Sequence, residues 1–260
     1  MTEVLERPAT AQPPRFGALF TRLVTAGLVA GALSGVYSML VTERAIQPAL
    51  DLEESRAAAD EAAAGGHAGG HEEELFSRGE QLVGGFLGTV LAGVVLAVLF
   101  AAVYGAVRHR LPGRSDFARV GVLALIGFGV LALLPALKIP ANPPAVGDPE
   151  TVGTRTAIYG ATLLCGALAA VLVGVLVHQL RARGTGIPAT AVAASVASAV
   201  LLALILLLIP GNPDSIASDV PADVVWDFRL ASLGQLAVIW AALGLAGGWL
   251  VDRLTTAQVR

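Results

Sequence analysis

The chain has 260 residues with a net charge of −3, and 55% of its residues are hydrophobic whereas only 14% are charged. Soluble domains carry about 25% charged residues, so this composition excludes an ordinary soluble domain and indicates an integral membrane protein. The single cysteine excludes an intramolecular disulfide, and the single lysine, Lys138, does not lie in a GxxxxGK sequence, which excludes a P-loop for nucleotide binding.

Six apolar stretches are long enough, or nearly so, to cross a hydrocarbon core of about 30 Å as helices. Helices are expected because an unpaired backbone group in lipid costs several kcal/mol. The predicted fold is therefore all-α, a polytopic membrane helix bundle with about six transmembrane helices. The transmembrane domain covers residues 23–251, between tails at 1–22 and 252–260. The first span is too long for a typical signal-peptide core and no obvious A-x-A site follows it, so we expect it not to be a cleaved signal peptide. The six spans are residues 23–41, 81–107, 120–137, 156–177, 189–209 and 230–251.

Basic residues alternate with acidic ones from one connection to the next. The two tails and the second and fourth connections hold eleven of the seventeen basic residues but only four of the twenty acids. The other three connections hold sixteen acids. By the positive-inside rule both termini are cytoplasmic and the acidic connections face outward, which predicts a multi-pass protein of the cytoplasmic membrane.

The first outward connection, residues 42–80, contains the sequence "GGHAGGHEEE" and has ten acids. Alanines favour helix before Gly65, and the glycines that follow favour coil around the two histidines. Imidazole and carboxylate groups suit divalent transition metals, and a mobile site would suit capture and release of the ion. The alternative is an acidic spacer with incidental histidines. The candidate metal ligands are His67, His71, Glu72, Glu73 and Glu74.

One phrase occurs twice: "IPANPP" begins at Ile139 and "IPGNPD" begins at Ile209. An arginine then precedes the next span in each case, Arg155 in "RTAIYG" and Arg229 in "RLASLG". We interpret spans three–four and five–six as parallel repeats of an outward-facing helical hairpin. The arginines are expected to anchor the interface or to pair with acids. The acids considered are Asp148, Glu150, Asp223 and Asp227.

No span carries a histidine or an acid at mid-depth, which argues against an enzyme, and nothing indicates nucleic-acid binding. If a metal ion crosses the bundle, the softer candidate ligands are Gln235, Cys165, Asn142 and Asn212. Glycine pairs at i, i+4 spacing predict close helix packing. They are Gly27, Gly31 and Gly35, then Gly84 and Gly88, and then Gly244 and Gly248.

The segments "LKIPANPPAVGDPETVGTRTAIYG" at 137–160 and "VPADVVWDFRLASLGQ" at 220–235 resemble the CbtA family of proposed cobalt transporter subunits, as does a histidine-bearing loop after the first span. The resemblance implies uptake of cobalt linked to cobalamin synthesis, together with a small one-span partner, CbtB, that carries a histidine-rich tail. Two functions stay open at this point. One is a divalent-metal permease subunit, and the other is a membrane scaffold that does not transport, with the acidic loop as a spacer.

Overall fold

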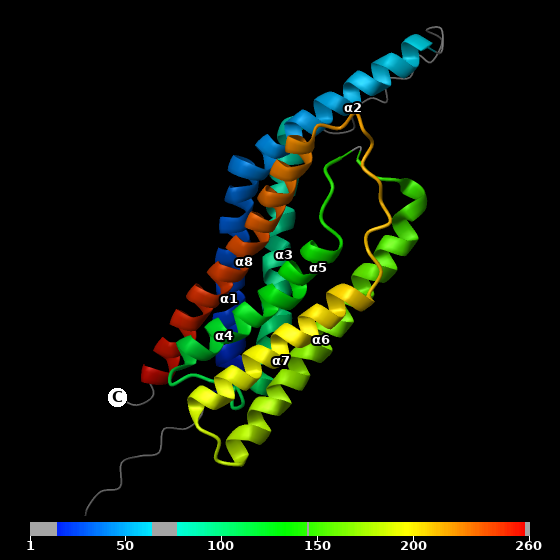
Figure 1. Cartoon of the computed structure of the whole chain (residues 1–260). Coiled ribbons are helices and arrows are strands. Elements are labelled where there is room, and N and C mark those ends of the chain that lie inside the picture. The colour runs from blue at the N-terminus through cyan, green and yellow to red at the C-terminus, as the bar shows by residue number, and fades with distance from the viewer. Residues whose placement is uncertain (1–14, 64–76, 145, 258–260) are drawn as a thin grey trace, which may run out of the picture.

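The protein is a bundle of helices. The computed structural model describes residues 15–63, 77–144 and 146–257, and every regular element in these ranges is a helix (Figure 1). Six stretches of the described residues are long and apolar enough to cross a membrane, which confirms the predicted six-helix membrane bundle. They are Phe16–Asp60, Arg78–Val107, Asp116–Lys138, Pro149–Ala182, Ile187–Leu208 and Ala222–Leu254.

The first stretch continues beyond the predicted end of its span. Helix α1 (Phe16–Tyr37) passes through one π-helical turn, η1 (Ser38–Thr42), into α2 (Glu43–Ala63). The alanine-rich sequence before Gly65 is helical, as predicted, because alanine has the highest helix propensity. Figure 1 shows α2 projecting from one end of the bundle, so the first part of the connection at 42–80 is a helix that stands away from the apolar core.

The third span is interrupted near its end. It consists of α4 (Asp116–Phe128), a π-helical turn η2 (Gly129–Leu133) and α5 (Leu134–Lys138). Pro135 lies inside this continuous helix and has no N–H to donate to the preceding turn, and the π-helical turn η2 just before it is where the regular α-helical bonding is interrupted. The chain therefore stays helical to Lys138, whose Nζ donates to the Leu206 carbonyl at 2.8 Å.

The remaining helices begin at recognisable caps. Helix α3 (Arg78–Val107) starts with a capping box, in which Ser77 Oγ accepts from the Glu80 N–H and the Glu80 carboxylate accepts from the Ser77 N–H. The 3₁₀ turn η3 (Pro149–Thr151) leads into α6 (Val152–Ala182) and is capped by the carboxylate of Asp148. Helix α7 (Ile187–Leu208) has a proline in its first turn, and α8 (Ala222–Ala257) is the last helix.

The buried core lies between α1, α3, α4 and α8, where Leu23, Tyr104 and Leu243 are almost fully buried. Close helix packing is confirmed for two of the three predicted groups of glycines, Gly27 to Gly35 and Gly244 with Gly248. A Cβ on Gly93 of α3 would lie 2.7 Å from the Gly31 Cα, and a Cβ on Gly244 would lie 2.9 Å from the Ala124 Cβ. The prediction for Gly84 and Gly88 is wrong within this chain, because a Cβ at either residue would meet nothing within 4 Å.

Helices α7 and α8 follow each other in the chain but do not pack along each other. Helix α7 packs on α6, whereas α8 packs between α1 and α4 (Figure 1). The last predicted hairpin is therefore open, and each of its helices finds a neighbour from another part of the chain. In a membrane, a helix surface that faces lipid is as apolar as one that faces another helix. Hydrophobicity therefore does not require α7 and α8 to pack on each other.

The two ends of the bundle differ in charge. One end holds α2 and the loops at 139–148 and 209–221, and we call it the proline-loop end (Figure 1). The opposite end, which we call the arginine end, holds the connections at 108–115 and 183–186. Apart from Asp116 and Asp252, the acids of the described residues belong to the proline-loop end. The described arginines of the arginine end are Arg15, Arg22, Arg108, Arg110, Arg114, Arg119, Arg181, Arg183 and Arg253.

Candidate functional site

The carboxylate of Asp214, in the loop at 209–221, is the centre of the polar contacts at the proline-loop end. Its side chain is completely buried, with an exposed fraction of 0%. Oδ1 accepts hydrogen bonds from Thr151 Oγ1 at 2.5 Å and from the Asp148 backbone N–H at 3.1 Å. Oδ2 accepts from Asn142 Nδ2 at 3.1 Å and forms an ion pair with Arg155 Nη1 at 2.7 Å. One buried acid thus joins the two proline-rich loops to the start of α6.

Burial alone would raise the pKa of Asp214, but its contacts outweigh burial. The hydrogen bonds from Thr151 and from the Asp148 N–H, the charge of Arg155 and the hydrogen bond from Asn142 together hold the pKa of this carboxyl below its usual range. Asp214 is therefore charged at neutral pH, and its counter-ion is Arg155. A carboxylate offers about four acceptor positions, and all four are used, so a metal ion would have to displace one of these partners to bind Asp214.

The second arginine of the repeated motif completes the same network. Arg229 Nε donates to the Ala141 carbonyl at 3.1 Å, and Arg229 Nη2 donates to Asn142 Oδ1 at 2.9 Å. Asn142 is therefore held by α8 on one side and by Asp214 on the other. The Asp214 backbone N–H donates to Asn212 Oδ1 at 3.2 Å within the second turn, while Asn142 of the first turn binds the Asp214 carboxylate. This confirms that both turns lie at the same end of the bundle.

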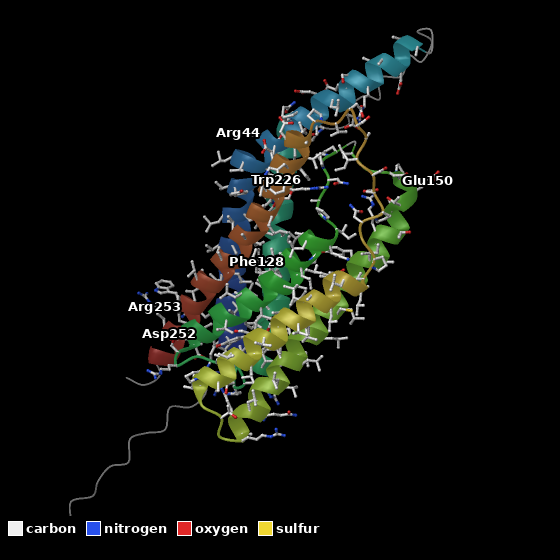
Figure 2. The ribbon with its side chains drawn as sticks, viewed as in Figure 1. Arg44, Phe128, Glu150, Trp226, Asp252 and Arg253 are labelled. Carbon is white, nitrogen blue, oxygen red and sulfur yellow. The ribbon has the colours of Figure 1, made fainter. Side chains whose placement is uncertain are left out.

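The partners expected for the two arginines were wrong. Asp148 contacts Arg155 only through its backbone carbonyl, at 3.4 Å, and the described contacts of Arg155 and Arg229 include no side-chain bond to Glu150, Asp223 or Asp227. Figure 2 shows Glu150 at the outer edge of this end. The arginines pair inward because a buried carboxylate and a loop carbonyl need donors more than exposed acids do.

Gly147 fits the loop around this acid. Its φ is +129°, in the region that favours glycine, and a Cβ there would lie 3.0 Å from Asp214 Oδ2. The glycine therefore lets the first proline loop turn tightly against the carboxylate.

Helix α2 covers both loops. Arg56 Nη2 forms an ion pair with Asp219 at 2.6 Å, and this hydrogen bond lowers the pKa of Asp219. A small apolar cluster of Val146, Val220 and Val225 packs with Leu52 of α2. The position of α2 is thus fixed against the loop that carries Asp214.

Inside the bundle, Gln235 of α8 contacts the first helical stretch. Its Oε1 accepts from Thr42 Oγ1 at 3.0 Å, and its carbonyl accepts from Ser34 Oγ at 3.3 Å. Thr42 belongs to the π-helical turn η1, a kind of turn that is frequent at functional sites. The predicted ligand Cys165 is half-buried on α6, and Asn142 and Asn212 are brought together, whereas Gln235 lies with a different set of residues.

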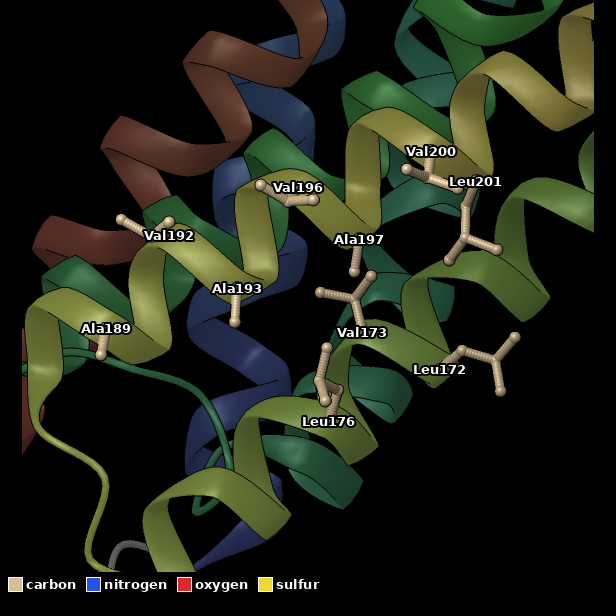
Figure 3. A pocket seen from close by; sticks show the side chains of 10 residues that line it. All are labelled: Leu172, Val173, Leu176, Ala189, Val192, Ala193, Val196, Ala197, Val200 and Leu201. Carbon is tan, nitrogen blue, oxygen red and sulfur yellow. The ribbon is translucent and has the colours of Figure 1, made fainter.

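The predicted metal ligands His67, His71, Glu72, Glu73 and Glu74 lie outside the described residues. Within residues 15–63, 77–144 and 146–257, no three His, Cys, Asp or Glu side chains form a group that could hold a metal ion. The groove between α6 and α7, of about 850 Å³, is lined by aliphatic side chains only, such as Leu176 and Val196, and offers no ligand atom (Figure 3).

Asp214 and Thr151 were not among the predicted site residues. The signal was present in the repeated phrase, because "IPANPP" has Pro144 where "IPGNPD" has Asp214. A charged residue that replaces a proline in one copy of a repeat indicates that this copy carries a contact that the other lacks.

Comparison with known families identifies the family of this chain. The family model described as "Probable cobalt transporter subunit (CbtA)" matches residues 16–252. No curated protein and no solved structure matches the chain. The matched range includes all six apolar stretches nearly complete, both proline loops and the network around Asp214.

Proposed function

Because the chain belongs to the CbtA family of probable cobalt transporter subunits, we propose that it is the membrane subunit of a cobalt uptake system linked to cobalamin synthesis. The observation that carries this proposal is the charge difference between the two ends of a six-helix bundle. The acids gather at the proline-loop end, where a divalent cation would be concentrated before it enters.

We place the protein in the cytoplasmic membrane with both termini in the cytoplasm. The support is the positive-inside rule, because the arginine end carries many described arginines and only two described acids, Asp116 and Asp252. In this orientation the proline-loop end and α2 face outward, and the histidine segment that follows α2 meets incoming metal first.

His67 and His71, with Glu72, Glu73 and Glu74, are proposed to collect the metal ion and pass it on. Helix α2 supports this role, since it leads the chain away from the bundle while Arg56 and Leu52 fix it over the proline loops (Figure 1). Neutral imidazole and carboxylate suit cobalt and its neighbours in the series.

Energy and further ligands are proposed to come from other chains. This chain has no GxxxxGK sequence, and its described residues hold no three-ligand metal group. Membership of the CbtA family implies a small, one-span, histidine-rich partner of the CbtB kind, and we propose that this partner supplies the further ligands. The lack of a three-ligand metal group among the described residues also favours the alternative function, a membrane scaffold that does not transport and uses the acidic loop as a spacer.

Growth and metal uptake of a deletion strain distinguish the two functions. Cobalt, nickel and zinc are supplied one at a time at limiting concentration, and the deletion is complemented with the wild-type chain or with an empty vector. We expect a loss of cobalt uptake that the wild-type chain restores, with zinc and nickel uptake unchanged. Uptake of all three metals at the wild-type rate in the deletion strain would exclude a transport role.

A further inference from the structure

Arg108, at the arginine end, is a buried cation. It follows the last residue of α3, and its backbone N–H still donates to the Tyr104 carbonyl at 2.8 Å. Only 8% of Arg108 is exposed, although it lies in the connection between two helices. Arginine is rarely buried without a partner, because removing its charge from water is costly.

No acid of the described residues neutralises Arg108. Its Nε donates to His109 Nε2 at 3.2 Å, and no described residue accepts a bond from its Nη atoms or forms an ion pair with it. The nearby acid, Asp116, is already engaged, since its Oδ1 accepts from Tyr104 Oη at 2.8 Å and from Arg119 Nη1 at 3.4 Å.

Arg119 adds a second cation with unused donor capacity. Its Nε is buried and has no hydrogen-bond partner among the described residues. Asp116 links Arg119 to the Tyr104 hydroxyl, and both Arg108 and Arg119 lie close enough to this hydroxyl to act on it electrostatically. The connection from 108 to 119 carries four arginines and one acid, which leaves an excess of positive charge.

This cluster lies at the level where lipid headgroups are expected. Trp249 lies near the end of α8 at the arginine end, and the Arg253 guanidinium lies 4.0 Å from the centre of its ring. Figure 2 shows Asp252 and Arg253 at this same end of the bundle, and tryptophan and arginine are typical of the membrane interface. The Asp252 carboxylate accepts from the Phe117 N–H at 3.4 Å, so the start of α4 is already occupied by an acid.

We infer that Arg108, with Arg119, binds the phosphate group of an anionic membrane lipid. A phosphate offers several oxygens, and guanidinium groups bind such oxygens with two parallel hydrogen bonds. Basic pockets between transmembrane helices bind acidic headgroups in this way. The lipid would supply the counter-charge that the described protein residues do not, and this site is independent of cobalt.

Thermal unfolding of the purified full-length chain in mixed micelles tests the inference with the wild-type protein alone. We expect phosphatidylglycerol to raise the unfolding temperature, whereas phosphatidylcholine and inorganic phosphate at matched concentrations leave it unchanged. Equal effects of the two lipids would overturn the inference. Protection by inorganic phosphate alone would also overturn it, because the site would then bind a soluble anion.

Two matched variants locate the effect. Arg108→Gln removes the buried cation, and Arg110→Gln removes an exposed cation from the same connection. We expect Arg108→Gln to weaken phosphatidylglycerol binding at least about tenfold and Arg110→Gln to weaken it less than about threefold, since a lost bidentate charged contact outweighs a screened surface charge. If Arg108→Gln does not fold, Arg108→Lys replaces it, and an intermediate loss is expected because lysine keeps the charge without the planar fork. Equal losses in Arg110→Gln and the Arg108 variant would overturn the assignment.

Discussion

Asn142 and Asp214 lie 72 positions apart in the chain, and Asn142 Nδ2 donates to Asp214 Oδ2 at 3.1 Å. Asn142 belongs to the first copy of the I-P-x-N-P motif and Asp214 directly follows the second copy, so this contact joins the two proline-rich loops directly. It also connects two arginines, because Arg155 binds the acid and Arg229 binds the asparagine. The two loops are therefore one structural unit, fixed by a single buried carboxylate, and this unit lies at the end of the bundle that we propose to face outward.

Replacing Asp214 by asparagine should destabilise the protein by about 1–3 kcal/mol, because Arg155 then lacks its counter-ion and a buried acceptor is lost. The estimate is below that for a fully buried ion pair, since the Arg155 side chain is 26% exposed. Asp227→Asn is the matched control, because this exposed acid at the same end has no ion pair with a described residue. Thermal unfolding in detergent measures both variants. Equal unfolding temperatures for the two variants would show that the network contributes no stability.

Low pH should lower the free energy of unfolding, in part through protonation of Asp214. Its folded-state pKa lies below the ordinary value of about 3.9, so its charge stabilises the fold above that value and the stabilisation is lost as the pH falls through the folded-state pKa. The difference in unfolding free energy between the wild type and Asp214→Asn should be constant from about pH 5 to 7 and should shrink below about pH 4. Denaturant titrations at a series of pH values measure this difference, and a difference that grows in acid would have the wrong sign for a lowered pKa.

Helix α3 offers a matched pair of glycines. A Cβ at Gly93 would lie 2.6 Å from the Gly27 carbonyl oxygen, whereas a Cβ at Gly88 would meet nothing within 4 Å. Gly93→Ala should cost about 1–3 kcal/mol, because α1 and α3 must separate. Gly88→Ala should stabilise the helix by up to about 1 kcal/mol, since alanine restricts the unfolded chain. The unfolding temperatures of the two variants should therefore shift in opposite directions, and a loss of stability in both would contradict the assigned helix contact.

Much of this fold could be predicted from the sequence. Hydropathy locates the six helices because lipid forces each backbone to satisfy its own hydrogen bonds, and the charge pattern places both I-P-x-N-P turns at one end. The separation of α7 from α8 could not be predicted, since residues such as Leu207 and Val196 are equally apolar whether they face lipid or a helix. The role of Asp214 could not be predicted from the sequence for a different reason. Charge counting treats Asp214, Asp219 and Asp223 alike, and only burial distinguishes them.

Reporter fusions test the proposed orientation. Fusions after Arg114 and Arg183 should be active only with a reporter that works in the cytoplasm, because both residues belong to arginine-rich connections. A fusion at Gly69 should be active only with a reporter that works outside. An otherwise intact fusion with Gly69 in the cytoplasm would contradict both the orientation and the proposed capture of external metal by His67 and His71.

The last prediction concerns the histidines themselves. Replacing both His67 and His71 by alanine should lower cobalt uptake when cobalt is scarce and have little effect when it is plentiful, because a capture site limits uptake only when the ion is dilute. Neutral imidazole is the form that binds metal, so wild-type uptake at scarce cobalt should also fall as the external pH drops through about 6.5, and the double variant should lack this dependence. His178→Ala is the control, since this exposed histidine lies at the arginine end of α6. The acids around the histidines would still attract cations in the double variant, in a salt-dependent way over a screening length of about 8 Å. If the double variant, at equal protein level, takes up scarce cobalt as fast as the wild type does, the segment is a spacer.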